Sequence, residues 1–233
     1  MHGKAQSAGP KGPDARGWSL RAAGAGEHVV LALELQGLLL LGFLAGGGLF
    51  GLFPALVAAA TVSRDDARDV SHPVWARFWS MWRAQFVSAN AAGLPLGILA
   101  TVAAVNLLYA APQSIGLGIV SAVGAVLVLA SLSWFGPLYA HYQLPRWRYP
   151  LVALRLVVQR PLPTMLMLLV AMAIAYLGSL STAVWVFVGV GAWLHACTYL
   201  AVRTFDENEE RLTDGPDAVS VAQILPSAPL DTR

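Results

Sequence analysis

The segment "LLLLGFLAGGGLFGLFPALVAAATV", residues 38–62, decides the fold, because it is almost wholly apolar and is interrupted near its middle. It belongs to a longer apolar run, residues 28–62. As one straight helix rising about 1.5 Å per residue, that run would exceed the roughly 30 Å hydrocarbon core of a bilayer. We therefore expect a helix break inside it. The residues that supply the break are Gly46, Gly47, Gly48, Gly51 and Pro54.

Two arrangements of this run are compatible with the break. In the first, residues 28–50 cross the membrane once and residues 54–64 form a short, half-embedded interfacial helix that begins at Pro54. In the second, residues 28–62 form a re-entrant hairpin that returns to its starting side. We favour the single crossing, because about 20 apolar residues suffice to span a bilayer. A cleavable signal peptide is not expected, since its apolar region is about 7 to 15 residues long.

Composition and charge distribution both indicate a membrane protein. Hydrophobic residues make up 57% of the 233 residues and charged residues 12%, against roughly a quarter charged in a soluble domain. No Lys, Arg, Asp or Glu lies between Arg83 and Arg146, or between Arg160 and Arg203, and each interval is long enough for two crossings. The sequence predicts an all-α, polytopic membrane helical bundle of about five transmembrane helices. Besides 28–50, the crossings are expected at about 93–110, 116–139, 163–180 and 183–202.

The chain is expected to form a single membrane domain, residues 28–203, between two tails. Residues 1–27 are rich in Gly, Ala and basic residues without apolar periodicity, and they predict a disordered polar tail. Residues 204–233 are acidic and contain several prolines, and they predict a second disordered tail. Neither tail is expected to contribute to the core.

The positions of the basic residues predict the orientation. Two loops are rich in arginine, the first within residues 64–83 and the second within residues 146–160, whereas the loops opposite them contain no Lys or Arg. The positive-inside rule makes the arginine loops and the C-terminus cytoplasmic, in the cell inner (plasma) membrane. Five crossings leave the basic N-terminal tail outside, whereas the re-entrant hairpin brings every basic segment inside.

The segment "VWARFWSMWRAQF", residues 74–86, has the pattern of an amphipathic helix. At about 100° per residue, its rings fall within one arc and its arginines on the other side. We expect a cytoplasmic interfacial helix over about 73–90 that contacts the lipid bilayer, with each indole N–H kept in water. Stacking on nucleic acid is disfavoured, because two cations accompany the rings and three aspartates precede them. The interface residues are Trp75, Arg77, Phe78, Trp79, Trp82, Arg83 and Phe86.

The later arginine loop has a weaker version of this pattern. Its aromatic and basic residues, Arg146, Trp147 and Arg148, precede a second expected interfacial helix over about 150–160, which leads into another two-crossing hairpin. We therefore interpret residues 73–140 and 150–202 as two structural repeats related by an axis along the membrane normal.

Two motifs resemble those of the YesL-like bacterial membrane protein family (domain of unknown function 624). The first is "GLFPALVAAATVSRD", which is similar to the family's helix-break segment. The second is "VWARFWSMWRAQFVSAN" followed by Gly93, which is similar to its aromatic and basic motif. The resemblance covers about residues 30–202. It implies a polytopic inner-membrane protein of unassigned molecular activity that assists carbohydrate uptake, with an oligosaccharide transporter complex as its partner.

Few residues are candidates for chemistry. Glu34 and His195 are the polar candidates inside expected crossings, although Glu34 is close enough to a helix end to reach the interface. His195 is compatible with a proton relay or with a hydrogen bond to a neighbouring helix. The chain contains none of the common catalytic or metal-binding motifs, so we expect a non-enzymatic protein with no cofactor and no metal. The alternatives are a small solute transporter or channel, and a lipid-modifying enzyme, for which no nucleophile or base is identifiable.

Overall fold

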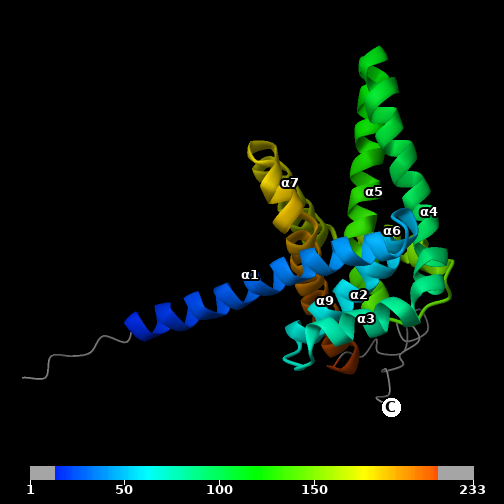
Figure 1. Ribbon diagram of the computed structural model, residues 1–233. Coiled ribbons are helices and arrows are strands. Elements are labelled where there is room, and N and C mark those ends of the chain that lie inside the picture. Colours follow the sequence, from blue (N-terminus) through cyan, green and yellow to red (C-terminus); the bar gives the residue numbers. More distant parts are fainter. Residues whose placement is uncertain (1–13, 215–233) are drawn as a thin grey trace, which may run out of the picture.

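The computed structural model describes residues 14–214, with the side chains of 26–183 and 187–207, and every element in this range is helical (Figure 1). This confirms the predicted all-α fold. The elements are α1 (Asp14–Ala45), α2 (Leu49–Ala67), α3 (Val74–Ala84), α4 (Phe86–Val105), η1 (Asn106–Ala110), η2 (Ala111–Gln113), α5 (Ile115–His141), α6 (Arg148–Gln159), α7 (Pro161–Leu180), α8 (Thr182–Val184), η3 (Trp185–Gly189) and α9 (Val190–Asp214).

The glycine segment reverses the chain between α1 and α2. Gly47 and Gly48 have φ angles of 71° and 83°, in a region that only glycine adopts without strain. A side chain at Gly51 would collide with the backbone of Gly42 and Phe43, so its absence lets the two helices meet. The predicted break is therefore present, but α1 ends at Ala45 and α2 already begins at Leu49.

Pro54 lies inside α2 and does not begin it, which corrects the sequence interpretation. A proline has no backbone N–H, so it leaves the carbonyl of residue i−4, here Phe50, without its helical partner. The side-chain amide of Asn90 in α4 donates a hydrogen bond to this carbonyl at 2.8 Å. The proline thus creates an acceptor inside α2 that fixes the start of α4 beside it.

The predicted interfacial helix 54–64 is wrong, because α2 is the central helix of the fold. It contacts α1, α3, α4, α5 and α9, and the side chains from Val57 to Ala60 are 0% exposed. These small residues let the surrounding helices approach closely. The expected crossing at residues 28–50 corresponds to the candidate span Gly26–Ala45 in α1, and α2 then runs back along α1.

Two long hairpins rise from the base that α2 and α3 form (Figure 1). One consists of α4 and α5, the other of α7 with the chain that follows it, and both tips point the same way, while α1 runs across their feet. By length and composition, four helical segments in the described range can cross a membrane. They are Gly26–Ala45, Phe86–Gln113, Ile115–His141 and Pro161–Leu180.

The expected fifth crossing, residues 183–202, is not among these spans. The chain there passes through α8 and the π-helical η3 before α9, which continues as a polar helix to Asp214. Both predicted tails are also shorter than expected: residues 14–27 belong to α1 and residues 204–214 to α9. The remainders of the two tails, residues 1–13 and 215–233, lie outside the described residues.

The expected helix 73–90 is divided at Gln85 into α3 and the start of α4. Gln85 has φ −102° and ψ 8°, outside helical geometry. Its side-chain oxygen accepts hydrogen bonds from the hydroxyls of Ser88, at 2.6 Å, and Tyr139 of α5, at 2.9 Å. The turn between α3 and α4 is therefore fixed by Tyr139 of α5, the other helix of the hairpin. This contact is long-range, so local periodicity does not predict it.

Tyr149 anchors α6 to the base. The side chain is 4% exposed, its hydroxyl donates to the carbonyl of Tyr142 at 2.9 Å, and it accepts from the N–H of Leu144 at 3.0 Å. Burial raises the pKa of the Tyr149 phenol, so the group remains a neutral donor. The rest of α6 carries exposed apolar residues, including Leu151 and Val158 at 60% and 74%, as expected of a surface helix that faces lipid.

Candidate functional site

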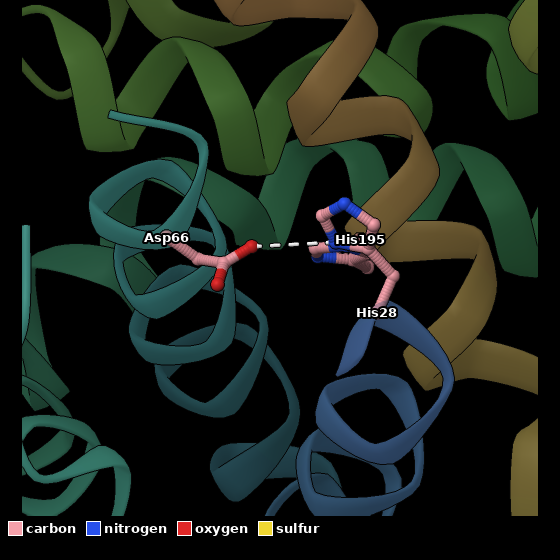
Figure 2. Close-up of side chains that lie close together, drawn as sticks. All are labelled: His28, Asp66 and His195. Carbon is pink, nitrogen blue, oxygen red and sulfur yellow. Dashed lines mark hydrogen bonds and ion pairs between the residues drawn. The ribbon is translucent and has the colours of Figure 1, made fainter. Parts of the chain in front are cut away.

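Two histidines and one aspartate from three helices converge at one place, and we call this group the His–Asp cluster (Figure 2). His28 comes from α1, Asp66 from the end of α2, and His195 from α9. The distance from His195 Nε2 to His28 Nδ1 is 3.3 Å, and that from His28 Nδ1 to Asp66 Oδ2 is 3.6 Å. All three ligand atoms lie within 4.8 Å of one another. The cluster therefore has the donor set and the proximity needed to hold a metal ion or to share a proton.

Ser63 fixes the ring of His195 from the protein side. Its hydroxyl lies 3.3 Å from His195 Nδ1, and the serine is 0% exposed. His195 itself is 8% exposed, whereas the side chains of His28 and Asp66 are 52% and 38% exposed. The cluster is thus built from one rigid, buried residue and two residues that solvent reaches.

A cavity of about 310 Å³ opens beside the cluster. Asp66 belongs to both, and the lining of the cavity also includes Asp69 and His72. Asp65 also lines the cavity, but Arg77 pairs with it at 2.8 Å. The cavity gives small polar solutes access to Asp66, on the edge of the cluster.

Residues 64–68, at the end of α2, form a junction segment that joins several helix ends. Arg64 donates to the backbone carbonyl of Ala140 at the end of α5 and pairs with Asp65 at 2.8 Å. Arg68 pairs with Asp206 of α9 at 2.8 Å. The ends of α2, α5 and α9 therefore lie together on the side that carries the arginine loops.

Several of the predicted interface residues are exposed as expected. Trp75 and Trp147 are 60% and 64% exposed, and the guanidinium of Arg148 lies 5.0 Å from the ring centroid of Trp147. Arg83 and Arg146 are exposed as well. These side chains are free to reach lipid headgroups.

The other aromatic residues of α3 pack into the protein, which corrects the expectation that the whole ring face contacts lipid. Phe78 is 0% exposed, and the absence of a side chain at Gly42 of α1 makes room for Phe78 and Trp82. The rings of Trp79 and Trp82 lie 5.4 Å apart and those of Trp82 and Phe86 4.9 Å apart. The indole nitrogens of Trp79 and Trp82 are buried and not kept in water.

The two polar candidates from the sequence have different environments. Glu34 is exposed on α1 and is not part of the cluster, whereas His195 is at its centre. Gln36, two residues after Glu34, accepts a hydrogen bond from the N–H of Gly191 at 2.7 Å. That bond ties α1 to the start of α9, next to the turn of α9 that carries His195.

Sequence reasoning missed His28, Ser63 and Asp66. His28 looks like the boundary of an apolar run, and Asp66 lies in "RDDARD", which is typical of a solvated turn. The one available signal was that the chain places His28 and Asp66 at opposite ends of the interrupted run, residues 28–62. A re-entrant hairpin, the arrangement that we did not favour, brings those two ends together.

Fold and surface together define this chain as a helical membrane protein with several candidate spans. The family described as "Protein of unknown function, DUF624" matches residues 33–107. "Uncharacterized protein YesV" of Bacillus subtilis (strain 168) is 31% identical over 190 residues, which are 78% of this chain and 90% of that protein. The chain therefore belongs to the DUF624 family, as the two sequence motifs predicted. No solved structure matches it.

Proposed function

We propose that this protein is a non-enzymatic accessory component of the cell inner membrane that binds a carbohydrate transporter through its long hairpins. The observation that carries the proposal is the apolar surface of these hairpins. Within the spans of α4, α5 and α7, 17% of the most apolar window is buried in the protein. Exposed side chains such as Ile98, Ile119 and Met172 are 56%, 61% and 65% exposed. Such surfaces suit both lipid and a second membrane protein.

The carbohydrate part of the proposal rests on the family resemblance. YesL-like proteins are associated with carbohydrate uptake, and this chain belongs to the same family. An accessory role also agrees with a protein whose largest exposed surfaces are apolar helix faces. The proposed partner thus transports an oligosaccharide. It contacts this protein at the apolar faces of the two hairpins.

Photo-crosslinking in intact cells tests the partner. A photoreactive residue at Ile98 or Ile119, on the hairpin, is expected to crosslink to a membrane subunit of a carbohydrate transporter. The same residue at Val70, which is 46% exposed but follows the junction segment, serves as the control. Lipid adducts alone at both hairpin positions would contradict the proposal, as would recovery of the same protein from Val70.

We also propose that the N-terminal segment is cytoplasmic together with the arginine loops. His28 at the start of the apolar part of α1 lies 3.6 Å from Asp66 at the end of α2, and two residues in contact share one side of a bilayer. The hairpin alternative then applies, and all basic segments follow the positive-inside rule.

Cysteine labelling checks this orientation. In a Cys197→Ser background, which removes the single native cysteine, single cysteines are placed at Ser7, Ser71 and Ser114. We expect Ser7→Cys and Ser71→Cys to react with an impermeant thiol reagent only after the membrane is opened. Ser114→Cys, at the tip of the first hairpin, is expected to react in intact cells. Reaction of Ser7→Cys in intact cells would place the N-terminal segment outside and contradict this orientation.

The second candidate function is a small solute transporter, and the cavity beside the His–Asp cluster favours it. The cavity is lined by both charged and apolar side chains and includes Asp66, a member of the cluster that can exchange protons. Purified protein in liposomes would then move ions or sugars, and His195→Ala would abolish the flux, whereas Glu34→Gln would not, since Glu34 lies outside the cluster. Absence of flux with these substrates in intact proteoliposomes would exclude it for them.

A further inference from the structure

We propose that the His–Asp cluster is a binding site for a divalent transition-metal ion, with Zn²⁺ as the best fit. The ligand atoms are His28 Nδ1, Asp66 Oδ2 and His195 Nε2. Two imidazoles and one carboxylate are a common three-residue ligand set for zinc, with a further position left for water or another small ligand. The site is independent of the accessory role proposed above.

The distances agree with tetrahedral coordination. Metal–ligand bonds of about 2.0 to 2.1 Å at tetrahedral angles separate neighbouring ligand atoms by about 3.3 Å. The two histidine nitrogens are 3.3 Å apart, and His28 Nδ1 and Asp66 Oδ2 are 3.6 Å apart. The third pair, His195 and Asp66, lies within 4.8 Å. Since the side chains of His28 and Asp66 are 52% and 38% exposed, a small rotation closes that gap.

Hydrogen bonds within the cluster cannot join all three facing atoms at once. Nδ1 of His28 faces both His195 Nε2 and Asp66 Oδ2, and a neutral ring nitrogen carries one proton or one lone pair. If this nitrogen is protonated, its one proton serves two acceptors. If it is not, its lone pair faces the carboxylate. A cation between the three atoms accepts a lone pair from each of them.

Ser63 provides the outer support that zinc-binding histidines usually have. A histidine that coordinates through one nitrogen donates the N–H of the other to a fixed acceptor. Ser63 Oγ lies 3.3 Å from His195 Nδ1 and is fully buried. When His195 carries its proton on Nδ1, Ser63 Oγ accepts it, and the lone pair of Nε2 is then available on the side of His28.

The cavity supplies access and an open coordination position. It reaches the cluster at Asp66 and has a volume of about 310 Å³, which is enough for water and a small ligand. Because the three ligands come from α1, α2 and α9, a bound ion would link α1 to both α2 and α9. Metal binding is therefore expected to raise the thermal stability of the protein.

Metal binding to the full-length protein tests the proposal. The protein is purified in detergent without a polyhistidine tag, stripped with a chelator, and titrated with Zn²⁺ against a chromophoric competitor. We expect one equivalent to bind and the thermal midpoint to rise. His28→Ala and Asp66→Asn, at partly exposed positions, are expected to weaken binding at least about 100-fold, and Ser63→Ala about 10-fold.

His72→Ala is the matched control, because His72 lines the same cavity but is not part of the cluster. Its affinity is expected to stay within about twofold of the wild type, since no ligand is removed. The metal-free thermal midpoints of His28→Ala and the wild type should agree, which shows that the variant is folded. Zinc affinity that is equal in the wild type and in folded His28→Ala would overturn the proposal, and so would the absence of stoichiometric binding.

Discussion

Helix α5 is more apolar than α2, but α2 is the more deeply buried of the two helices. The span of α5 has a mean hydropathy of 2.4, yet 17% of its window is buried in the protein. The less apolar α2, which ends in Arg64, Asp65 and Asp66, is surrounded by other helices and buried from Phe53 to Ser63. In a soluble protein the most apolar helix would be the core. Here the core helix is the one made of small residues, and the strongest hydropathy marks the helix that faces lipid.

The difference teaches that hydropathy and helix packing are separate signals in this fold. Ala58, Ala59 and Ala60 contribute little transfer free energy, but they let neighbouring helices approach the backbone of α2. The Val and Leu side chains on α5 gain much more free energy when they leave water, and the bilayer provides the apolar environment for that transfer. Substitutions that add volume should therefore harm α2 contacts, and those that add charge should harm the hairpins.

The largest effect is expected at the contact of α4 with α2. A side chain at Gly93 would collide with the ring of Phe53, whereas nothing lies within 4 Å of a side chain at Gly124 of α5. Gly93→Leu should cost at least about 3 kcal/mol or prevent folding, while Gly124→Leu should be close to neutral. Thermal unfolding in detergent measures both. Equal midpoints for the two variants would mean that α4 does not pack on α2 through Gly93.

A charge on the hairpin is expected to have the next largest effect. Val126 lies in the middle of α5 and is 51% exposed. Val126→Lys should oppose membrane insertion by about 2.5 to 3.5 kcal/mol if this face contacts lipid, whereas Val126→Leu should insert normally. Extraction of isolated membranes with alkaline carbonate, followed by immunoblotting, compares them. Normal insertion of the lysine variant would show that a protein or water covers this face.

A moderate effect is expected where α5 meets α7. Trp134 is 0% exposed, and its indole N–H donates to Thr164 Oγ1 at 3.0 Å. Thr164→Val leaves that buried donor without an acceptor and should cost about 1 to 3 kcal/mol in the free energy of unfolding. Thr164→Ser keeps the hydroxyl and is the control. If urea denaturation gives the same free energy of unfolding for Thr164→Val and Thr164→Ser, the hydrogen bond does not contribute to stability.

The smallest effect on stability is expected at Trp75 on α3. Its side chain is 60% exposed, so Trp75→Ala should change the free energy of unfolding by no more than about 0.5 kcal/mol. Binding of α3 to headgroups should nevertheless weaken, which a lipid-contact assay with a spin label at Ser80 would detect. Trp75→Phe, which keeps an apolar ring, should retain more contact. A strong loss of stability in Trp75→Ala would place this ring in the protein core.

The sequence predicted the apolar helices but not their mutual arrangement. The crossings at about 116–139 and 163–180 nearly coincide with α5 and α7, because continuous apolar runs between charges define spans directly. The role of α2 was missed, because the same "PALVAAATV" pattern suits a half-embedded helix and a helix enclosed by protein. Enclosure depends on partners far along the chain, which periodicity does not encode.

Of the three residues in the His–Asp cluster, the sequence predicted only His195 as a candidate. His195 stood out as a polar side chain in an apolar segment, but His28 and Asp66 occupy ends of helices where polar residues are ordinary. Their convergence requires the reversal at Gly47 and Gly48 and the return of α9 to the same place. Each of these is a long-range property, so the metal-ligand spacing that sequence motifs rely on is absent here.

The junction segment has a consequence for the order of biosynthesis. Residues 64–68 leave the ribosome early, yet Ala140 and Asp206, which Arg64 and Arg68 bind, are made much later. Until α5 and α9 have been inserted, these arginines have only water, headgroups or nearby aspartates as partners. A chain that stops before α9 would leave Arg68 without Asp206 and α2 without one of its covering helices. Packing of α9 against α2 is therefore one of the last contacts that the growing chain is able to complete.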